Sequence, residues 1–422
     1  MPTVLRPAPL AEALGGDTVP LQRQVRRVEA RRTLRAVGLV LPAFAFLFVS
    51  FVVPILSLLS LSVQNPELPE VLPRTAAAIR AWDASALPSP EIVAAFVADL
   101  RDADRAKTVG RAGKRLNYDI SGFRSLMLQT ARDLPPPETP APRLLEKLRA
   151  LDERWGDIRY WAAIKRAAGP VTDFYLLAAL DRRRDVRGHV VQVPTGDAIY
   201  VNALGRTFGI SFVVTVVCLV LGYPIAYLLA GLPTRVSNFL MILVLLPFWT
   251  SLLVRTTAWI VLLQPEGLLN DLAVFLGLFR ARVPLIYNRT GVYVAMVHIL
   301  LPFMVLPMYS VMKGISPSHM RAAASLGAGP LLAFWKVYLP QSMPGVAAGS
   351  LLVFILALGY YITPALVGGA SDQMLSYFVA FFTNQTLNWG MAAALSVILL
   401  TVVLVMFAIF HRVVGIDRLK LG

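Results

Sequence analysis

The segment TFGISFVVTVVCLVLGYPIAYLLAG, residues 207–231, contains no aspartate, glutamate, lysine or arginine. A helix needs about 20 apolar residues to cross the hydrocarbon core of a bilayer, which is roughly 30 Å thick. The segment is therefore predicted to be a transmembrane helix. Further apolar segments of the same kind lie at 36–63, 239–263, 291–312, 345–367 and 390–411. The sequence predicts an all-α, polytopic membrane protein with six transmembrane helices.

The composition of the 422-residue chain agrees with this class. Hydrophobic residues make up 56% of the chain and charged residues 15%, whereas a soluble domain carries about 25% charged residues. A single cysteine, Cys218, excludes a disulfide framework and any metal site built from several thiolates. The net charge of +15 raises the alternative of nucleic-acid binding. The basic residues gather on one side of the predicted spans, so we interpret them as an orientation signal and predict no nucleic-acid partner.

Arginine and lysine determine the predicted orientation. The basic N-terminal segment, 1–35, precedes a first span that is too long for a cleaved signal peptide and lacks a small-residue cleavage site. Six spans place both termini on one side, and the loops of that side hold Arg235, Lys313, Arg321, Lys336, Arg412, Arg418 and Lys420. The opposite loop at 264–290 holds a weaker counter-signal. Because cytoplasmic loops are enriched in basic residues, both termini, including the tail 413–422, are predicted to be cytoplasmic.

The segment 64–200 differs from the rest of the chain. Residues 65–200 contain 21 basic and 18 acidic residues, so this insert is polar and nearly neutral. Spaced apolar residues predict helices at 91–108, 143–167 and 171–183. The predicted topology places the insert outside the cytoplasm as a helical cap, ahead of a five-helix core at 201–412 that contains a cytoplasmic loop at 313–342.

Residues for catalysis or for holding a cofactor are not evident. The four histidines are far apart, so neither a zinc site nor any other metal site is predicted, and no phosphate loop or nucleophile elbow is complete. Placing a polar side chain inside a membrane span costs free energy, so such residues are candidates for function. The candidate translocation path consists of Trp249, Arg255, Trp259, Tyr360, Tyr361 and Thr363. Two alternatives stay open: Arg255 could be a structural arginine, and the aromatic residues could form a membrane-interface belt. His298 is interpreted as an interhelical hydrogen-bond partner.

The loop between the fourth and fifth predicted spans has a distinctive spacing. Residues 319–340 read HMRAAASLGAGPLLAFWKVYLP, which predicts a short helix, a turn at Gly327 and a second helix. Glycine permits the positive φ that a sharp turn needs. The pattern consists of Arg321, Ala322, Ala323, Gly327, Ala328, Phe334, Val337, Leu339 and Pro340. Apart from its first residue, this pattern resembles the coupling loop of permease subunits in bacterial ABC importers.

This resemblance implies a six-helix permease fold of the type I importers and a loop that docks on a cytoplasmic ATPase. The family usually has glutamate where this chain has Arg321, which puts one docking ion pair in doubt. Segments such as LGYPIAY at 221–227, PFWTS at 247–251 and TPALVGG at 363–369 resemble the spermidine/putrescine branch of these permeases. The insert is not part of the usual pattern.

The resemblance also implies partners and a location. These are cytoplasmic ATPase subunits that bind the ATP, a second and different permease, an extracytoplasmic solute-binding protein, and the bacterial inner membrane. Polyamine is the first expectation for the solute, although no predicted span contains Asp or Glu to balance its charge. An amino acid or opine-like anion, with Arg255 as its partner, is the main alternative. Two alternatives come from other classes of membrane protein: a secondary transporter that works alone, and a sensor whose active part is the insert.

Overall fold

The computed structural model describes residues 37–414, so the predicted basic segment 1–35 and most of the tail 413–422 lie outside the described residues. The chain divides into two compact units, 1–59 and 60–422. In the first unit, a helix of 24 residues from Val37 to Ser60 includes the π-helix η1 (Phe48–Val52) and α2 (Val53–Ser60). Its side chains are exposed as far as Leu58, which suits a helix surrounded by lipid. This agrees with the predicted first span at 36–63.

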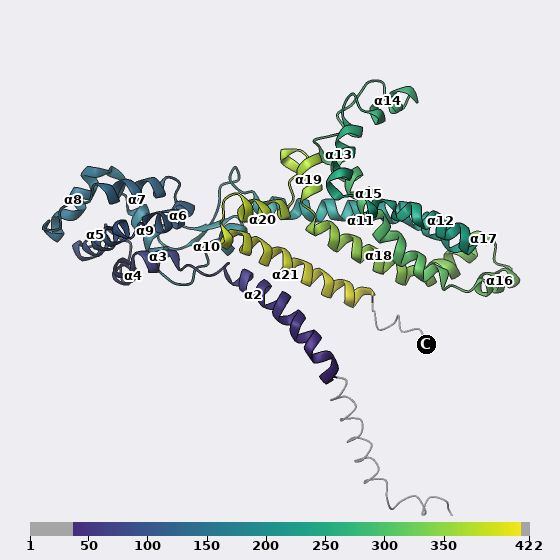
Figure 1. The fold of residues 1–422 in the computed structure, drawn as a ribbon, viewed down its shortest axis with the longest axis horizontal. Helices are drawn as coiled ribbons and strands as arrows, with labels where there is room; N and C mark the ends of the chain where they lie inside the picture. The colour runs from purple at the N-terminus through teal and green to yellow at the C-terminus, as the bar shows by residue number, and fades with distance from the viewer. Residues whose placement is uncertain (1–36, 415–422) are drawn as a thin grey trace, which may run out of the picture. The chain divides into compact units, whose positions relative to one another are not determined.

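The second unit contains the other helices long enough to cross a membrane (Figure 1). Three of them are α11 (Tyr200–Gly231), α15 (Arg289–Lys313) and α21 (Trp389–Val414). A fourth, Pro330–Gly359, consists of α17 (Pro330–Ala333), the π-helix η4 (Phe334–Tyr338) and α18 (Leu339–Gly359). The shorter helices are α14 (Leu268–Phe275), α16 (Pro317–Ser325), η5 (Ala370–Asp372) and α20 (Leu375–Asn384).

The predicted span at 239–263 corresponds to a bent pair of helices, not to one continuous helix. Here α12 (Thr234–Leu245) continues into the 3₁₀ turn η3 (Leu246–Trp249), and α13 (Leu252–Leu263) follows at an angle of 95°. Pro247 has no amide hydrogen for a continuing helix, and Thr250 is extended. The described chain therefore has five straight candidate spans, or six if this bent pair counts as one.

The predicted span at 345–367 corresponds to the helix Pro330–Gly359, and it is wrong at its C-terminal end, because the helix stops at Gly359. Tyr360 is extended, and a separate short helix, α19 (Ile362–Val367), begins after it. Pro364 has no amide hydrogen to donate to the Tyr360 carbonyl. That carbonyl instead accepts a hydrogen bond of 2.6 Å from Ser376 Oγ.

The membrane core consists of α11, α15 and α18, which pack against one another. Glycines allow the close approach: a Cβ on Gly349 would lie 2.9 Å from the carbonyl oxygen of Met304, and one on Gly345 would lie 2.9 Å from Cα of Met308. Gly345 and Gly349 are four residues apart on one face of α18. Such pairs of small residues let membrane helices pack backbone to backbone.

The insert is a separate helical layer with its own hydrophobic core. Its elements are α3 (Glu67–Val71), α4 (Pro73–Ile79), α5 (Pro90–Arg105), α6 (Val109–Asp119), α7 (Phe123–Arg132), α8 (Ala141–Leu151), η2 (Glu153–Gly156), α9 (Ile158–Ala167), α10 (Phe174–Ala179), and the antiparallel hairpin β1 (Arg182–Arg184) and β2 (Val190–Gln192). Phe96, Trp155 and Trp161 are fully buried and pack ring against ring.

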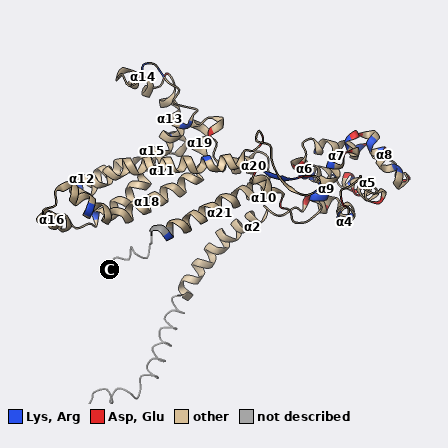
Figure 2. Cartoon of the chain, turned by 180° about the vertical axis from the view of Figure 1, so that it is seen from behind, with Lys and Arg blue, Asp and Glu red and all other residues tan. Residues whose placement is uncertain are grey.

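The predicted helices of the insert are partly confirmed. The prediction at 91–108 corresponds to α5. The predicted helix 143–167 is wrong as a single element, because Asp152 and Asp157 cap new helical turns and divide it into α8, η2 and α9. The predicted helix 171–183 is reduced to α10, and β1 follows it. Most charged side chains of the described chain lie in the insert, whereas the long helices carry few (Figure 2).

Candidate functional site

The loop at 313–342 forms two helical arms joined by a tight turn. Ser316 caps the first arm, α16, through a hydrogen bond that its Oγ accepts from the Ser318 amide. After α16, Gly327 has a φ of +84°. The amides of Leu326 and Ala328 donate to the carbonyls of Ala322 and Ala323, at 3.1 and 3.0 Å. The predicted glycine turn is thus present, and it closes the C-terminus of α16 in the way that left-handed caps do.

The second arm begins with α17 and η4, and it faces the bundle through Phe334. The Phe334 ring lies 6.1 Å from Tyr223 and 5.8 Å from Tyr227 of α11. Val337 is half-buried. The two arms are joined by a 2.7 Å hydrogen bond between His319 Nδ1 and Gln341 Oε1. The shape of this loop is therefore set by internal contacts of the chain.

Other side chains of the loop point away from the bundle. Leu326 is 89% exposed, Leu331 74% and Trp335 60%. Sequence reasoning missed these three residues, although apolar side chains in a polar loop were the available signal. Arg321 is exposed and has no partner among the described residues. Of the remaining predicted residues, Ala322 and Pro340 are exposed, Ala328 and Leu339 are half-buried, and Ala323 is buried.

The loop and the insert lie at opposite ends of the membrane helices (Figure 1). Helix α11 begins at Tyr200, directly after the insert, and ends at Gly231. At that far end, Lys313 Nζ donates to the carbonyls of Ala230 and Leu232 at 3.3 and 3.2 Å. Because Lys313 ends α15 just before the loop, the loop lies at the end of α11 that is opposite the insert.

Part of the candidate translocation path forms a polar cluster where α13, α15 and α19 meet. Trp259 Nε1 donates to His298 Nδ1 at 3.1 Å, which confirms the interhelical role of His298. Thr256 and Thr363 are buried, and their hydroxyls lie 3.3 Å apart. Thr256 was not among the predicted residues, and nothing in the sequence distinguished it from the neighbouring Thr257. This contact fixes the half-helix α13 against α19.

Arg255 lies in this cluster with an unusual environment. Its Nε and Nη1 atoms are inaccessible to solvent and have no hydrogen-bond partner among the described residues. Arg255 directly precedes Thr256 in α13. Two residues of the predicted translocation path are exposed. Trp249 is 80% exposed and lies at the break before α13, and Tyr361 is 38% exposed.

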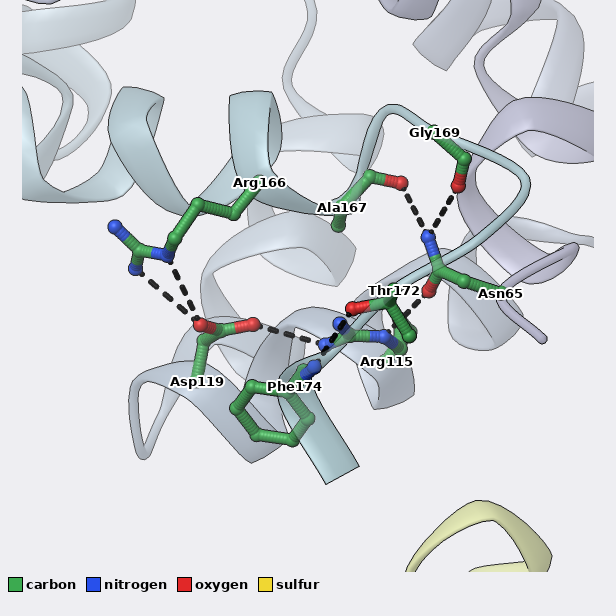
Figure 3. Close-up of polar contacts among 8 residues, drawn as sticks. All are labelled: Asn65, Arg115, Asp119, Arg166, Ala167, Gly169, Thr172 and Phe174. Carbon is green, nitrogen blue, oxygen red and sulfur yellow. Dashed lines mark hydrogen bonds and ion pairs between the residues drawn. The ribbon is translucent and has the colours of Figure 1, made fainter. Parts of the chain in front are cut away.

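A second polar cluster, at the other end of the molecule, holds the insert together (Figure 3). Arg115 is 1% exposed, and its Nη1 pairs with Asp119 Oδ2 at 2.8 Å. Asp119 also pairs with Arg166 at 3.2 Å. The Arg115 guanidinium stacks over the Phe174 ring at 4.5 Å, a favourable contact for a desolvated cation. The cluster joins α6, α9 and the start of α10.

Comparison with known proteins identifies the relatives of the core. Residues 222–414 match the family described as binding-protein-dependent transport system inner membrane component. The chain is 34% identical over 216 residues to the spermidine/putrescine transport system permease protein PotB of Escherichia coli K12, which covers 51% of this chain and 78% of that protein. It is 32% identical over 230 residues to the inner membrane ABC transporter permease protein YdcU of the same organism, covering 51% and 72%.

One solved structure with a similar arrangement is a bacterial ABC transporter involved in the import of the acidic polysaccharide alginate. It has a TM-score of 0.43 and 16% sequence identity, and the match covers 50% of this chain and 79% of that chain.

Proposed function

Because this chain belongs to the family of binding-protein-dependent transport system inner membrane components, as its relatives show, we propose that it lines half of the path for a polyamine in an ATP-driven importer. The chain is an inner-membrane permease of the ABC importer class. In the proposal, a different permease supplies the other half of the path, and separate cytoplasmic subunits hydrolyse ATP. The insert faces the extracytoplasmic side, where a solute-binding protein delivers the substrate, and both termini are cytoplasmic.

The observation that carries the proposal is the two-armed loop at 313–342. Its exposed apolar residues Leu326, Leu331 and Trp335 offer a surface for an ATPase. The π-helix η4 continues directly into α18, and α18 packs against α15 and α11. A displacement of the loop by the ATPase would therefore move the helices of the core as rigid levers.

Polyamine is favoured because one relative that matches the core is a spermidine/putrescine permease. A second candidate is an amino acid or opine-like anion, and the environment of Arg255 favours it. Two guanidinium nitrogens of Arg255 have no protein partner among the described residues, and the guanidinium charge is suited to a carboxylate. The described spans contain no Asp or Glu that would balance a polycation.

The test is reconstitution of the chain in proteoliposomes with its ATPase, its partner permease and its binding protein. We expect ATP-dependent uptake of labelled spermidine or putrescine, and Gly327→Pro should abolish substrate-stimulated ATP hydrolysis without preventing membrane insertion. Normal stimulation in that variant would overturn the docking role of the loop. Uptake of an amino acid or opine but of no polyamine, lost in Arg255→Gln, would establish the second candidate.

A further inference from the structure

The exposed apolar side chains of the insert are confined to one stretch. The whole insert is described, and its large exposed hydrophobic residues are Val171, Leu180, Val190 and Ile199, which are 68%, 44%, 42% and 44% exposed. The helical part before residue 170 contributes none of them. The large exposed apolar side chains of the insert are thus limited to 30 residues of a layer whose surface is otherwise polar.

The same stretch carries unpaired positive charge. Arg182, Arg183 and Arg187 are exposed and have no partner among the described residues, whereas Arg184 pairs with Asp173. These four arginines are among the residues that line a cleft of about 1210 Å³. Two acidic residues nearby already accept hydrogen bonds from backbone amides. Asp181 is buried and caps α11, and Asp185 accepts a hydrogen bond from the His189 amide. Asp197 is the remaining acidic residue of the stretch.

Three contacts hold the stretch at the ends of the spans. The amide of Thr172 donates to the carbonyl of Val63, a residue that follows the first span in the chain. A Cβ on Gly390, in the first turn of α21, would lie 2.5 Å from the Tyr175 ring, so α10 rests directly on that helix. The Asp181 carboxylate accepts from the amides of residues 199–201, where α11 begins.

We propose that residues 170–199 form a collar on the membrane surface that binds the head-group phosphates of anionic phospholipids. The aliphatic side chains would enter the interface between head groups and acyl chains, as in amphipathic surface segments. Arginine suits phosphate because its planar guanidinium donates paired hydrogen bonds. The continuity of the collar with the first turns of α11 and α21 favours a lipid partner over a soluble one. This inference does not depend on which solute is transported.

The test uses the full chain in nanodiscs of phosphatidylcholine, with or without about one third phosphatidylglycerol. Bound phosphatidylglycerol is counted by native mass spectrometry, and the unfolding temperature is measured in both lipids. The triple variant R182Q/R183Q/R187Q removes the unpaired arginines. The matched control R124Q/R132Q/R143Q removes three exposed arginines from α7 and α8, which lie at the end of the insert away from α10 (Figure 1).

We expect phosphatidylglycerol to bind the wild type and to raise its unfolding temperature. Each arginine removed from the collar should weaken that binding by about fivefold, and the control variant should behave like the wild type. The charge-preserving variant R182K/R183K/R187K should bind phosphatidylglycerol more tightly than the glutamine variant and more weakly than the wild type, because lysine keeps the charge but not the paired hydrogen bonds. This variant separates loss of charge from misfolding. Equal phosphatidylglycerol binding by both glutamine variants would overturn the proposal. So would an unchanged lipid response combined with lost affinity for the solute-binding protein, because the collar would then dock that protein.

Discussion

Arg115 Nε donates to the side-chain oxygen of Asn65 at 2.6 Å, although the two residues are 50 positions apart in the chain. The Asn65 amide nitrogen in turn donates to the carbonyls of Ala167 and Gly169, at 2.6 and 2.7 Å. One asparagine, placed just after the first span, therefore connects α6 with the end of α9. The insert is fastened at the point where the chain leaves the membrane.

Replacing Asn65 by alanine should destabilise the insert by about 2–4 kcal/mol, because it leaves a buried guanidinium and two carbonyls with fewer partners. Hydrogen exchange of α6 and α9 should accelerate in the full-length protein. Gln64→Ala is the matched control, since the Gln64 side chain is exposed and donates a hydrogen bond to nearby Ser60. Equal protection in Asn65→Ala and Gln64→Ala would show that the buried bonds are replaced by water.

The contact between Tyr175 and Gly390 should determine how firmly α10 rests on α21. In Gly390→Ala the new methyl group would overlap the Tyr175 ring, so we expect faster hydrogen exchange in α10 and a lower unfolding temperature. Adding Tyr175→Ala should remove the overlap, and the double variant should lose less stability than the two single losses predict together. Additive losses would contradict a direct clash. Gly205→Ala, which meets no atom within 4 Å, is the control.

The packing of α18 on α15 should be sensitive to one methyl group. Gly349→Ala would place a Cβ 2.9 Å from the Met304 carbonyl oxygen, and overpacking of this kind costs about 1–3 kcal/mol. The unfolding temperature of the protein in nanodiscs should fall. Gly209→Ala on α11 has open space around it and should leave the temperature unchanged or slightly higher, since alanine favours the helix.

Arg321 should contribute to the choice of ATPase. Its exposed side chain in α16 has no partner within the described chain, so we predict that it faces an acidic patch on the ATPase. Arg321→Glu should weaken assembly with that subunit by about 1–3 kcal/mol, as measured by titration of the purified components. Arg235→Glu reverses an exposed charge on α12, at the same end of the bundle, and should have little effect. Tighter assembly of Arg321→Glu would exclude the acidic patch.

Two aspartates make the insert sensitive to acid. Hydrogen bonds from the Arg154 side chain lower the pKa of Asp152 below its ordinary value of 3.8, and those from Arg159 do the same for the pKa of Asp157. The unfolded chain then binds more protons than the folded chain near that value, so these carboxylates stabilise the fold at higher pH. The contribution is complete above the ordinary pKa and disappears as the pH falls through the lowered one.

The measurement is the protection of α8 and α9 against hydrogen exchange between pH 6 and pH 3, corrected for the intrinsic exchange rate. Protection should fall toward pH 3 in the wild type. The double variant Asp152→Asn/Asp157→Asn should be less stable at pH 6 and should change less across the range. The same slope in the variant and in the wild type would place the acid-sensitive groups elsewhere.

The amino-acid sequence by itself determined the membrane class, most of the spans and the turn at Gly327. Apolar runs such as 207–231 must be helical in lipid, because every backbone hydrogen bond has to be made within the segment. A glycine between two short helices is likewise a local signal, and the structure gives it a φ of +84°. Helix α5 was predictable for the same reason, since its apolar face repeats along one continuous element.

Only the tertiary structure decided the features that depend on contacts distant in the chain. The break between α12 and α13 lies inside an apolar run, and α13 is held there by the contact of Thr256 with Thr363. Which aromatic residue of the loop faces inward was settled by Tyr223 and Tyr227 of α11. The bond between Asn65 and Arg115 and the hairpin of β1 and β2 have no periodic pattern that predicts them. The two partners of that bond are distant in the sequence and meet only after the helices have packed.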